Sequence, residues 1–590
     1  MKILNFAPNA YIGAHAVPEA IVLKELRRAG HEIIQITCNG IYSNYCVSMS
    51  AAGVLTDDDQ SKKERVCLQC KTNKKYIAER FNINQVDLEQ FVNSDDLKNA
   101  ELIVDKLNLY NWCDFKVEEI PVGRYAAYEF ILNNKLNSEN LTVEEFNRLK
   151  KHIVDCLVTI TAARRILEAH QPDRYVTYNS NYSVNNVFAA VANNKHCSAY
   201  TLHAGSHALR RLEQITITKG VRALAPLSRQ TTWHEFRQRN LTKSQIQLAH
   251  EHILELSIAK SPWVYSIKAR GVSTEQLFSK FGISGQKKVV LAVMSSKDED
   301  FAGRFIGAQS TIAEKSVFYS QEVWIDKLIS HMDGRKDAVL IIRPHPREFP
   351  NKRESVLSPT AVRLRSWLAN TPENIKINWP EDNISLHDLL KIVDIGLHTT
   401  STAGLEMLLF GIPVINYVHT ELAYPRSLDL CAQTEAQYFD YIDTLLTTAQ
   451  PSFQNICEVY KWFCYNSEVA SINIGDVFKQ RSDSLFSRLI RKIYKIFDSS
   501  NPFLDYKVSY DKRPKNYRWL TYAIESNQRD HFQEFINITR SDSSNLRPCD
   551  ASKLQIKVLK MLKRLAINDP IYERKLKNIM RSEESYDRST

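Results

Sequence analysis

Residues 394–417 read DIGLHTTSTAGLEMLLFGIPVINY, and this stretch decides the fold class of the second half of the chain. An apolar run ends at His398, threonines and serines follow, a helical stretch leads to Gly411, and a second apolar run begins at Pro413. Short apolar runs joined by a helix are typical of parallel strands with a crossover connection. The segment therefore predicts a parallel α/β sheet.

The same alternation extends in both directions along the chain. In the second half it predicts further strands at 288–294, 338–343 and 375–378. In the first half it predicts strands at 2–6, 31–37, 174–178 and 198–202. We expect two Rossmann-like α/β domains that face a cleft, with a helical C-terminal extension. The expected boundaries are 1–270 for the N-terminal domain, with an insertion at about 45–140, then 271–470 for the C-terminal domain and 471–590 for the extension.

Length and composition exclude several classes of protein. A chain of 590 residues is too long for one ordinary core. Hydrophobic residues make up 44% and charged residues 24%, which are globular values. No apolar run reaches the roughly 18–20 residues of a membrane-spanning helix, and MKILNFAP lacks the features of a signal peptide. Eleven cysteines, an odd number, indicate a reducing compartment, so we expect a cytoplasmic protein.

The positive charge is concentrated at one end. Residues 481–590 hold 23 lysines and arginines against 14 acidic residues, which accounts for +9 of the net +10. Apolar residues at 485–497 recur at helical spacing between basic ones, the pattern of a basic amphipathic helix. This favours attachment to an anionic membrane surface over nucleic-acid binding. Packing of the apolar stripe on the protein body is the competing interpretation.

The stretch 338-AVLIIRPHPRE-348 places a histidine just past a strand. Pro344 and Pro346 flank His345, and each proline restricts its own backbone and that of the residue before it. Ligands of α/β sheets bind at the carboxyl ends of the strands. His345 is therefore a candidate phosphate-binding residue, with Arg343 as a source of positive charge. A turn that carries a surface histidine is the alternative.

The cluster before the helix of 402–410 is a second candidate phosphate site. Hydroxyl groups and free backbone N–H groups at such a point can bind an anion, which nominates Ser401 and Thr402. Glu406 lies one turn further along, where it could reach a ribose. The alternative is that Ser401 or Thr402 only caps the helix. Ser295 and Ser296 follow another strand and are expected to complete the pocket.

Together these motifs resemble those of a known enzyme family. RPHP, followed about fifty residues later by D-x6-S-T-x3-E and a GIPVI strand, resembles the C-terminal domain of GT-B type glycosyltransferases of bacterial capsule and surface-polysaccharide assembly. The similarity is to Kdo transferases and, more distantly, to sialyl- and polysialyltransferases. It implies that His345, Ser401 and Thr402 bind the phosphate and ribose of a donor nucleotide. The E-x7-E pattern of many retaining members is absent, because His398 stands eight residues before Glu406.

The resemblance also implies a general base and an acceptor site in the N-terminal domain. Candidate bases are His15 and Glu19 in the first strand–helix loop and His203 after the strand of 198–202. Candidate acceptor-binding residues are Asn179, Asn181 and His207. No cofactor is required, because the nucleotide sugar is itself a substrate.

Four early cysteines are an alternative candidate for a structural zinc site, although the expectation is that no metal is bound. Cys38, Cys46, Cys67 and Cys70 supply enough thiols for a tetrahedral site, but the C-x7-C spacing is unfamiliar and ordinary thiols are favoured. Walker A, G-x-G-x-x-G and H-E-x-x-H motifs are absent, which argues against kinases, dehydrogenases and metalloproteases.

The sequence therefore predicts a glycosyltransferase that moves a sugar, such as a CMP-linked ulosonic acid, from a nucleotide to a growing surface or capsular glycan. The glycan is expected to be lipid-linked or free, and the enzyme peripheral on the inner face of the cytoplasmic membrane. Three alternatives stay open: a transferase that uses CDP-glycerol or CDP-ribitol, a sugar-nucleotide 2-epimerase, and a non-catalytic protein that binds glycans or assembly partners.

Overall fold

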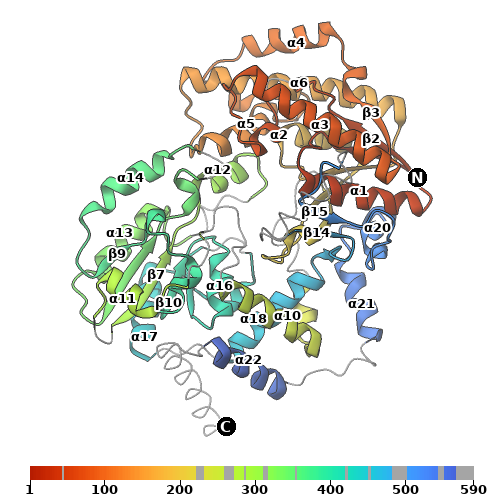
Figure 1. Ribbon diagram of the computed structural model, residues 1–590. Coiled ribbons are helices and arrows are strands. Elements are labelled where there is room, and N and C mark those ends of the chain that lie inside the picture. The colour runs from red at the N-terminus through yellow and green to blue at the C-terminus, as the bar shows by residue number, and fades with distance from the viewer. Residues whose placement is uncertain are drawn as a thin grey trace.

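Two α/β domains make up the protein (Figure 1). The computed structural model describes residues 1–42, 45–220, 232–257, 267, 271–284, 287–309, 316–351, 355–418, 423–448, 453–481, 501–542 and 551–565. Each domain is built on a largely parallel sheet with apolar clusters on both faces. The predicted α/β fold class is confirmed.

The N-terminal sheet has seven strands in the order β13-β6-β5-β4-β1-β2-β3. Strands β1 to β5 run parallel, whereas β6 is antiparallel to β5 and β13 is antiparallel to β6. Because β1 and β4 are neighbours in its centre, the loops that follow these two strands lie side by side. The strand bounds are β1 (Lys2–Phe6), β2 (Glu32–Thr37), β3 (Asn84–Asp87), β4 (Arg174–Tyr178), β5 (Ser198–Ala204), β6 (Gln214–Lys219) and β13 (Ile472–Asn473).

Helices from both halves of the N-terminal domain cover this sheet. One face packs on α5 (Val122–Asn134), α6 (Val143–His170) and α7 (Ser183–Asn194), and the other packs on α1 (Gly13–Arg28) and α3 (Gln60–Phe81). A capping box of Thr142 and Glu145 begins α6, the longest of the described helices. The predicted insertion at 45–140 is part of the domain itself, because β3 extends the sheet beside β2. Because the sequence of β3, NQVD, is polar, the hydropathy pattern does not reveal this edge strand.

The C-terminal sheet has six parallel strands in the order β12-β11-β10-β7-β8-β9. Residues 394–417 form β10, a short helix α16 (Ala403–Leu409) and β11. Strand β7 lies in the middle, so that the loops after β10, β7 and β8 meet at one edge. The bounds are β7 (Lys288–Val293), β8 (Ala338–Arg343), β9 (Ile375–Ile377), β10 (Ile395–His398), β11 (Val414–Asn416) and β12 (Leu430–Cys431).

Segments 472–481 and 501–525 return to the N-terminal domain, whereas a separate extension was predicted after residue 470. Strand β13 pairs with β6, and β14 (Phe478–Gln480) pairs with β15 (Tyr506–Val508). Helix α20 (Tyr517–Glu525) packs on α1, and Phe503 and Leu520 lie in the same core cluster as β1. Local periodicity shows that a segment is helical and amphipathic but not which core its apolar side completes.

The helical segments next to the second sheet also cross the predicted boundary. Helices α9 (Trp233–Arg237) and α10 (Lys243–Ser257) share a core cluster with α18 (Phe453–Glu468), α22 (Ala551–Leu565) and the C-terminal sheet. The predicted amphipathic helix of 485–497 lies outside the described residues. No helix in the described part of the chain is both long and apolar enough to cross a membrane.

Leu520→Ala tests whether the C-terminal segment is an integral part of the N-terminal domain. Leu520 is fully buried, so the substitution should lower the free energy of unfolding by about 2–5 kcal/mol. Chemical denaturation followed by circular dichroism measures this change. Arg518→Ala on an exposed position of the same helix is the matched control, and equal, small effects of both would show that α20 is dispensable.

Candidate active site at the carboxyl edges of the two sheets

Three loops of the C-terminal domain are hydrogen-bonded together at the carboxyl edge of its sheet. Ser295, after β7, shares a 2.7 Å hydroxyl contact with Thr399, after β10. Thr400 also donates to Ser295 at 3.3 Å. The backbone N–H of Lys297 donates to a carboxylate oxygen of Glu348, in the loop after β8, at 2.8 Å. The edge is therefore a fixed polar surface and not three independent loops.

His345 belongs to this edge in a defined protonation state. Its Nδ1 accepts a hydrogen bond from the backbone N–H of Arg347 at 3.3 Å. Burial, with the nearby charges of Arg347 and Arg343, lowers the pKa of His345 to about 3. The neutral ring therefore carries its proton on Nε2. The half-buried side chain is a hydrogen-bond donor of the kind that a phosphate oxygen accepts.

Arg343, which the sequence nominated as a donor-binding residue, is held inside the domain. It donates to the side chain of Asn378 and to the Ile384 carbonyl, the latter at 3.0 Å. Burial lowers its pKa to about 10, still well above neutral pH. Arg343 therefore acts on the carboxyl edge of the sheet only through its positive charge. Its hydrogen bonds connect β8 to the loop after β9.

The residues around α16 are less accessible to a ligand than their sequence pattern suggests. Ser401 accepts a hydrogen bond from the backbone N–H of Ala403 at 3.2 Å, so its hydroxyl caps the helix, whereas Thr402 is exposed. Glu406 is buried and pairs with His387 at 2.7 Å. Gly404 is required here, because a Cβ would lie 2.3 Å from the Tyr424 hydroxyl and 2.4 Å from Nε2 of His398.

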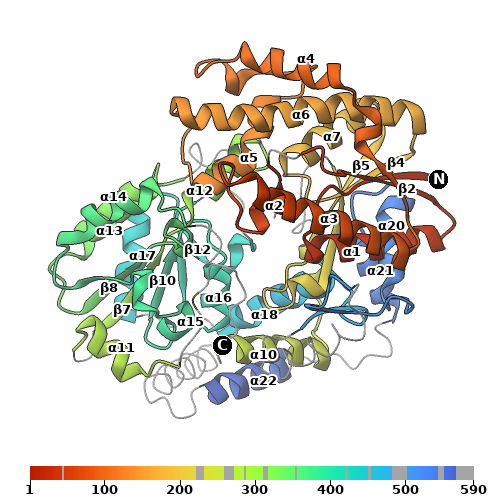
Figure 2. The same cartoon turned by 45° about the horizontal axis from the view of Figure 1, so that its top comes forward.

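Ser295 and Ser296 precede a helix that connects the two domains. Helix α12 (Lys297–Phe305) begins directly after them and packs on α5 of the N-terminal domain (Figure 2). Ser296 donates to Asp298, and Asp298 in turn accepts from Arg347 at 2.8 Å. The acidic run 297–300 is thus the first turn of a helix that packs on the other domain.

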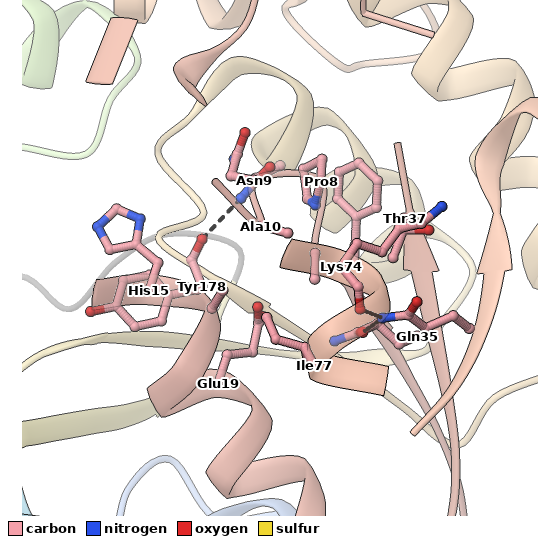
Figure 3. Close-up of a pocket in the computed structure, with 15 residues that line it drawn as sticks. Pro8, Asn9, Ala10, His15, Glu19, Gln35, Thr37, Lys74, Ile77 and Tyr178 are labelled. Atoms are coloured by element: carbon pink, nitrogen blue, oxygen red, sulfur yellow. Dashed lines mark hydrogen bonds between the residues drawn. The ribbon is translucent and has the colours of Figure 1, made fainter. Parts of the chain in front are cut away.

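The three candidate bases converge at the carboxyl edge of the N-terminal sheet, where Figure 3 shows His15, Glu19 and Tyr178 lining one pocket. The rings of His15 and Tyr178 stack with centroids 4.5 Å apart, and His203 stacks on Tyr178 at 6.3 Å. His203 Nδ1 lies 3.2 Å from the Ala204 carbonyl, which can only accept. In the neutral ring Nε2 is therefore the unprotonated, basic nitrogen.

Glu19 is buried and protonated at neutral pH. Its carboxyl accepts a hydrogen bond from Asn5 at 2.7 Å, but burial dominates and raises its pKa to about 8. Glu129, whose carboxylate accepts the Ser183 backbone N–H at 2.8 Å, also has a pKa raised by burial, to about 7. Glu19 is thus a group that exchanges a proton near neutral pH, as acid–base catalysis requires.

Two residues that the sequence analysis missed connect the two edges electrostatically. Arg211, between β5 and β6, is half-buried, and its pKa is lowered mainly by burial and raised by Tyr178, Tyr182 and Glu299. Glu299 belongs to α12 of the other domain and also affects the pKa of Tyr128. The two edges therefore face a common region. The RRLE stretch at 210–213, close to a strand end, was the available signal.

The predicted acceptor-binding residues fall into two groups. Asn179 and Asn181 lie in the turn after β4, where Asn179 adopts a left-handed backbone (φ 52°) and Asn181 is hydrogen-bonded to the Tyr128 hydroxyl. This turn directly follows Tyr178, on which His15 and His203 stack. His207 lies in a different cavity, next to α10 and α20, and is not brought together with them.

The four early cysteines line a neighbouring pocket of the N-terminal domain. Burial raises the pKa of Cys38 to about 12 and that of Cys46 well above its usual value, so both are protonated thiols. Zinc requires thiolates. Within the described ranges no group of three or more histidine, cysteine or acidic side chains is arranged to hold a metal ion.

Comparison with known proteins yields distant structural likeness only. No protein family and no curated protein matches the sequence. Among solved structures, S. aureus MnaA with UDP is 11% identical, with a TM-score of 0.28 over 84% of this chain and 97% of that one. The UDP-GlcNAc 2-epimerase of Methanocaldococcus jannaschii is 12% identical, with a TM-score of 0.28 over 76% and 95%. KpsC of Thermosulfurimonas dismutans, a β-Kdo 2,7 transferase, is 13% identical, with a TM-score of 0.27 over 52% and 79%.

Glu19→Gln should change how stability depends on pH. Because the folded chain holds this proton more tightly than the unfolded chain, the stabilisation is fully present below about pH 4.5 and is lost as the pH rises through about 8. The Tm of the wild type should therefore fall relative to that of Glu19→Gln across this interval. Thermal unfolding at a series of pH values measures the difference. The exposed Glu32→Gln is the control, and a pH-independent difference for Glu19→Gln would contradict the buried, protonated state.

Proposed function

We propose that the protein is a nucleotide-sugar-dependent glycosyltransferase with its donor site at the carboxyl edge of β7, β8 and β10. The observation that carries the proposal is His345, a neutral ring with its proton on Nε2, at the point where three strand-end loops are hydrogen-bonded together. A donor phosphate that leaves during transfer gains negative charge. A fixed N–H donor stabilises that charge without reorganisation.

The opposite edge supplies the complementary group. The basic nitrogen of the neutral His203 ring is Nε2, because Nδ1 donates to the Ala204 carbonyl. The stacked Tyr178 restrains its ring. In our proposal this nitrogen takes the proton of the acceptor hydroxyl as the bond to the sugar forms. One histidine thus donates a hydrogen bond to the leaving group, while the other accepts the proton of the nucleophile.

The remaining sequence candidates take secondary roles in this proposal. Ser401 holds the start of α16 in place, and the exposed Thr402 is the side chain there that can reach a ribose or phosphate. Asn181 and the Tyr128 hydroxyl form the polar wall next to His15 and His203 and are suited to bind acceptor hydroxyls. No metal or cofactor takes part in these steps.

The Glu19 carboxyl favours a second candidate function, that of a sugar-nucleotide 2-epimerase. Epimerisation removes and returns a proton at one carbon and needs no acceptor, so it requires acid and base groups in the same site. Glu19 is a protonated carboxyl that lines one pocket with Tyr178, and His203 stacks on the same Tyr178. In this alternative the edges of both sheets bind one substrate molecule. A polyol-phosphate transferase would use the same donor edge with CDP-glycerol or CDP-ribitol.

Donor consumption separates these candidates. The full chain is incubated with CMP-, UDP-, GDP- and CDP-activated sugars and with CDP-glycerol, with and without a glycan acceptor. A glycosyltransferase releases nucleotide faster when acceptor is present, and the product contains sugar without phosphate. An isomerised donor without acceptor supports the epimerase, and phosphate in the product supports the polyol transferase. Neither turnover nor nucleotide binding with any donor would refute the proposal.

His345→Ala should lower turnover in the active assay by about 100-fold or more while the Tm changes little. His345→Gln restores part of the activity, because its amide can still donate. The wild-type contribution of His345 should be constant between pH 5 and 9, since the pKa of about 3 keeps the ring neutral. His331→Gln, on α13 (Gln321–Met332) at the opposite edge of the sheet, is the matched control. Activity that His345→Ala leaves intact would show that the donor phosphate binds elsewhere.

We also propose that the protein works on the cytoplasmic face of the membrane, where a lipid-linked glycan is accessible. The support is the basic amphipathic pattern of 485–497. Replacing Arg488, Arg491, Lys492 and Lys495 by alanine should reduce co-sedimentation with vesicles that contain phosphatidylserine, and have no effect with neutral vesicles. A truncation after residue 480 is unsuitable, because it removes Leu520 from the core. Equal sedimentation of both proteins would exclude this anchor.

A further inference from the structure

A large polar cavity lies away from the two sheet edges of the candidate active site. Its volume is about 540 Å³, within the range of ligand pockets. The walls come from the loop after β5, from α10, from the end of α18, and from α20 and α21 (Phe532–Asp542). Figure 1 shows α20 and α21 on one side of this region and α10 and α18 on the other. None of the residues assigned to the proposed transfer reaction lines it.

Three side chains in its walls have polar atoms without a hydrogen-bond partner among the described residues. They are Nε2 of His207, Oγ of Ser467 and Nδ1 of His531. All three side chains are at least nine-tenths buried. A buried polar atom without a partner costs about 1–3 kcal/mol. A ligand in the cavity can supply the missing bond to such a group.

A ligand that bonds to these atoms needs both a hydrogen-bond donor and a hydrogen-bond acceptor. His207 Nδ1 accepts the backbone N–H of Arg210 at 3.2 Å, and its pKa is lowered to about 4 by burial and by Arg210, so Nε2 carries the proton and donates. His531 already donates to the Val469 carbonyl, and its pKa is lowered to about 3, so its Nδ1 accepts. A hydroxyl group can satisfy either atom.

The remaining described wall residues exclude anions and add a stacking surface. Arg210 is the one basic side chain in the wall apart from the neutral histidines, and it pairs with Glu251 at 3.8 Å. Glu213 and Glu468 add two further carboxyls. The rings of Trp519 and Phe535 lie 5.3 Å apart at the same wall. Amides complete the lining: Gln214, Gln247, Asn473 and Asn516.

We propose that this cavity binds a neutral carbohydrate, with its hydroxyl groups bonded to His207, Ser467 and His531 and a sugar face against Trp519. Aromatic rings with amide, hydroxyl and carboxyl groups suit a ligand that has many hydroxyls and no charge. The site is independent of the proposed transfer reaction, and its test uses no nucleotide. Segment 203–207 leads directly from His203, at the carboxyl edge of the N-terminal sheet, to His207 in the cavity. The proposed active site and the cavity therefore share one loop.

Titration of the full chain with neutral trisaccharides tests the site. Maltotriose, cellotriose and tri-N-acetylchitotriose are the probes, and calorimetry and tryptophan fluorescence are the readouts. We expect at least one to bind in the millimolar range or tighter. Ser467→Ala should weaken that binding about fivefold at unchanged Tm, because it removes a hydroxyl without a partner. His207→Phe, which keeps a ring beside Phe463, should weaken it further.

Matched controls distinguish sugar binding in this cavity from binding at the proposed active site. Ser330→Ala, at an exposed position of α13, and His203→Ala should both bind the sugar like the wild type. Trp519→Phe should remove most of the fluorescence change and keep part of the affinity. Failure of all three sugars to bind, equal binding by Ser467→Ala and the wild type, or binding of spermine or inorganic phosphate in place of sugar would each overturn the proposal. Sugar binding by a catalytically inactive protein would support this site although the proposed function failed.

Discussion

The buried pair of Arg347 and Asp298 is the interaction on which the arrangement of the two domains depends. The guanidinium donates to Asp298 at 2.8 Å and to the Leu132 carbonyl of α5, in the other domain, also at 2.8 Å. Both charged side chains are at least 97% buried. Removing either partner would leave an uncompensated buried charge, which typically costs 3–5 kcal/mol. The pair therefore keeps α12 and the loop after β8 against the N-terminal domain.

Arg347 also determines the chemistry of its neighbour. Its backbone N–H occupies Nδ1 of His345, and its charge helps to lower the pKa of that ring. Lys135 adds a second connection from the N-terminal domain, because its buried ammonium donates to the Phe349 carbonyl at 2.8 Å and to the Val356 carbonyl at 2.5 Å. The same short segment thus positions the domains and sets the proton of the candidate phosphate-binding histidine.

Sequence reasoning was most reliable where chemistry follows from local backbone. The Pro-His-Pro pattern predicted a restrained histidine at a strand end, and the alternation of apolar runs predicted most strands of both sheets. It was least reliable for long charged side chains. Arg343 and Glu406 have the right type and spacing for a nucleotide site, yet Asn378 and His387 hold them inside the domain. A side chain with several rotatable bonds can reach either solvent or a buried partner, and only packing decides which.

The sequence by itself determined the fold class, the edge of each sheet where chemistry is expected and the residue types gathered there, because these follow from periodicity and from turn residues along the chain. Only the tertiary structure decided which of them meet. It brought residues 472–481 and 501–525 back to the first sheet and made the acidic run 297–300 the first turn of a helix that packs on the other domain. It also separated His207 from His203 and gave His203 and His345 opposite tautomers. These outcomes depend on burial and on hydrogen-bond partners far away in sequence, which no local pattern records.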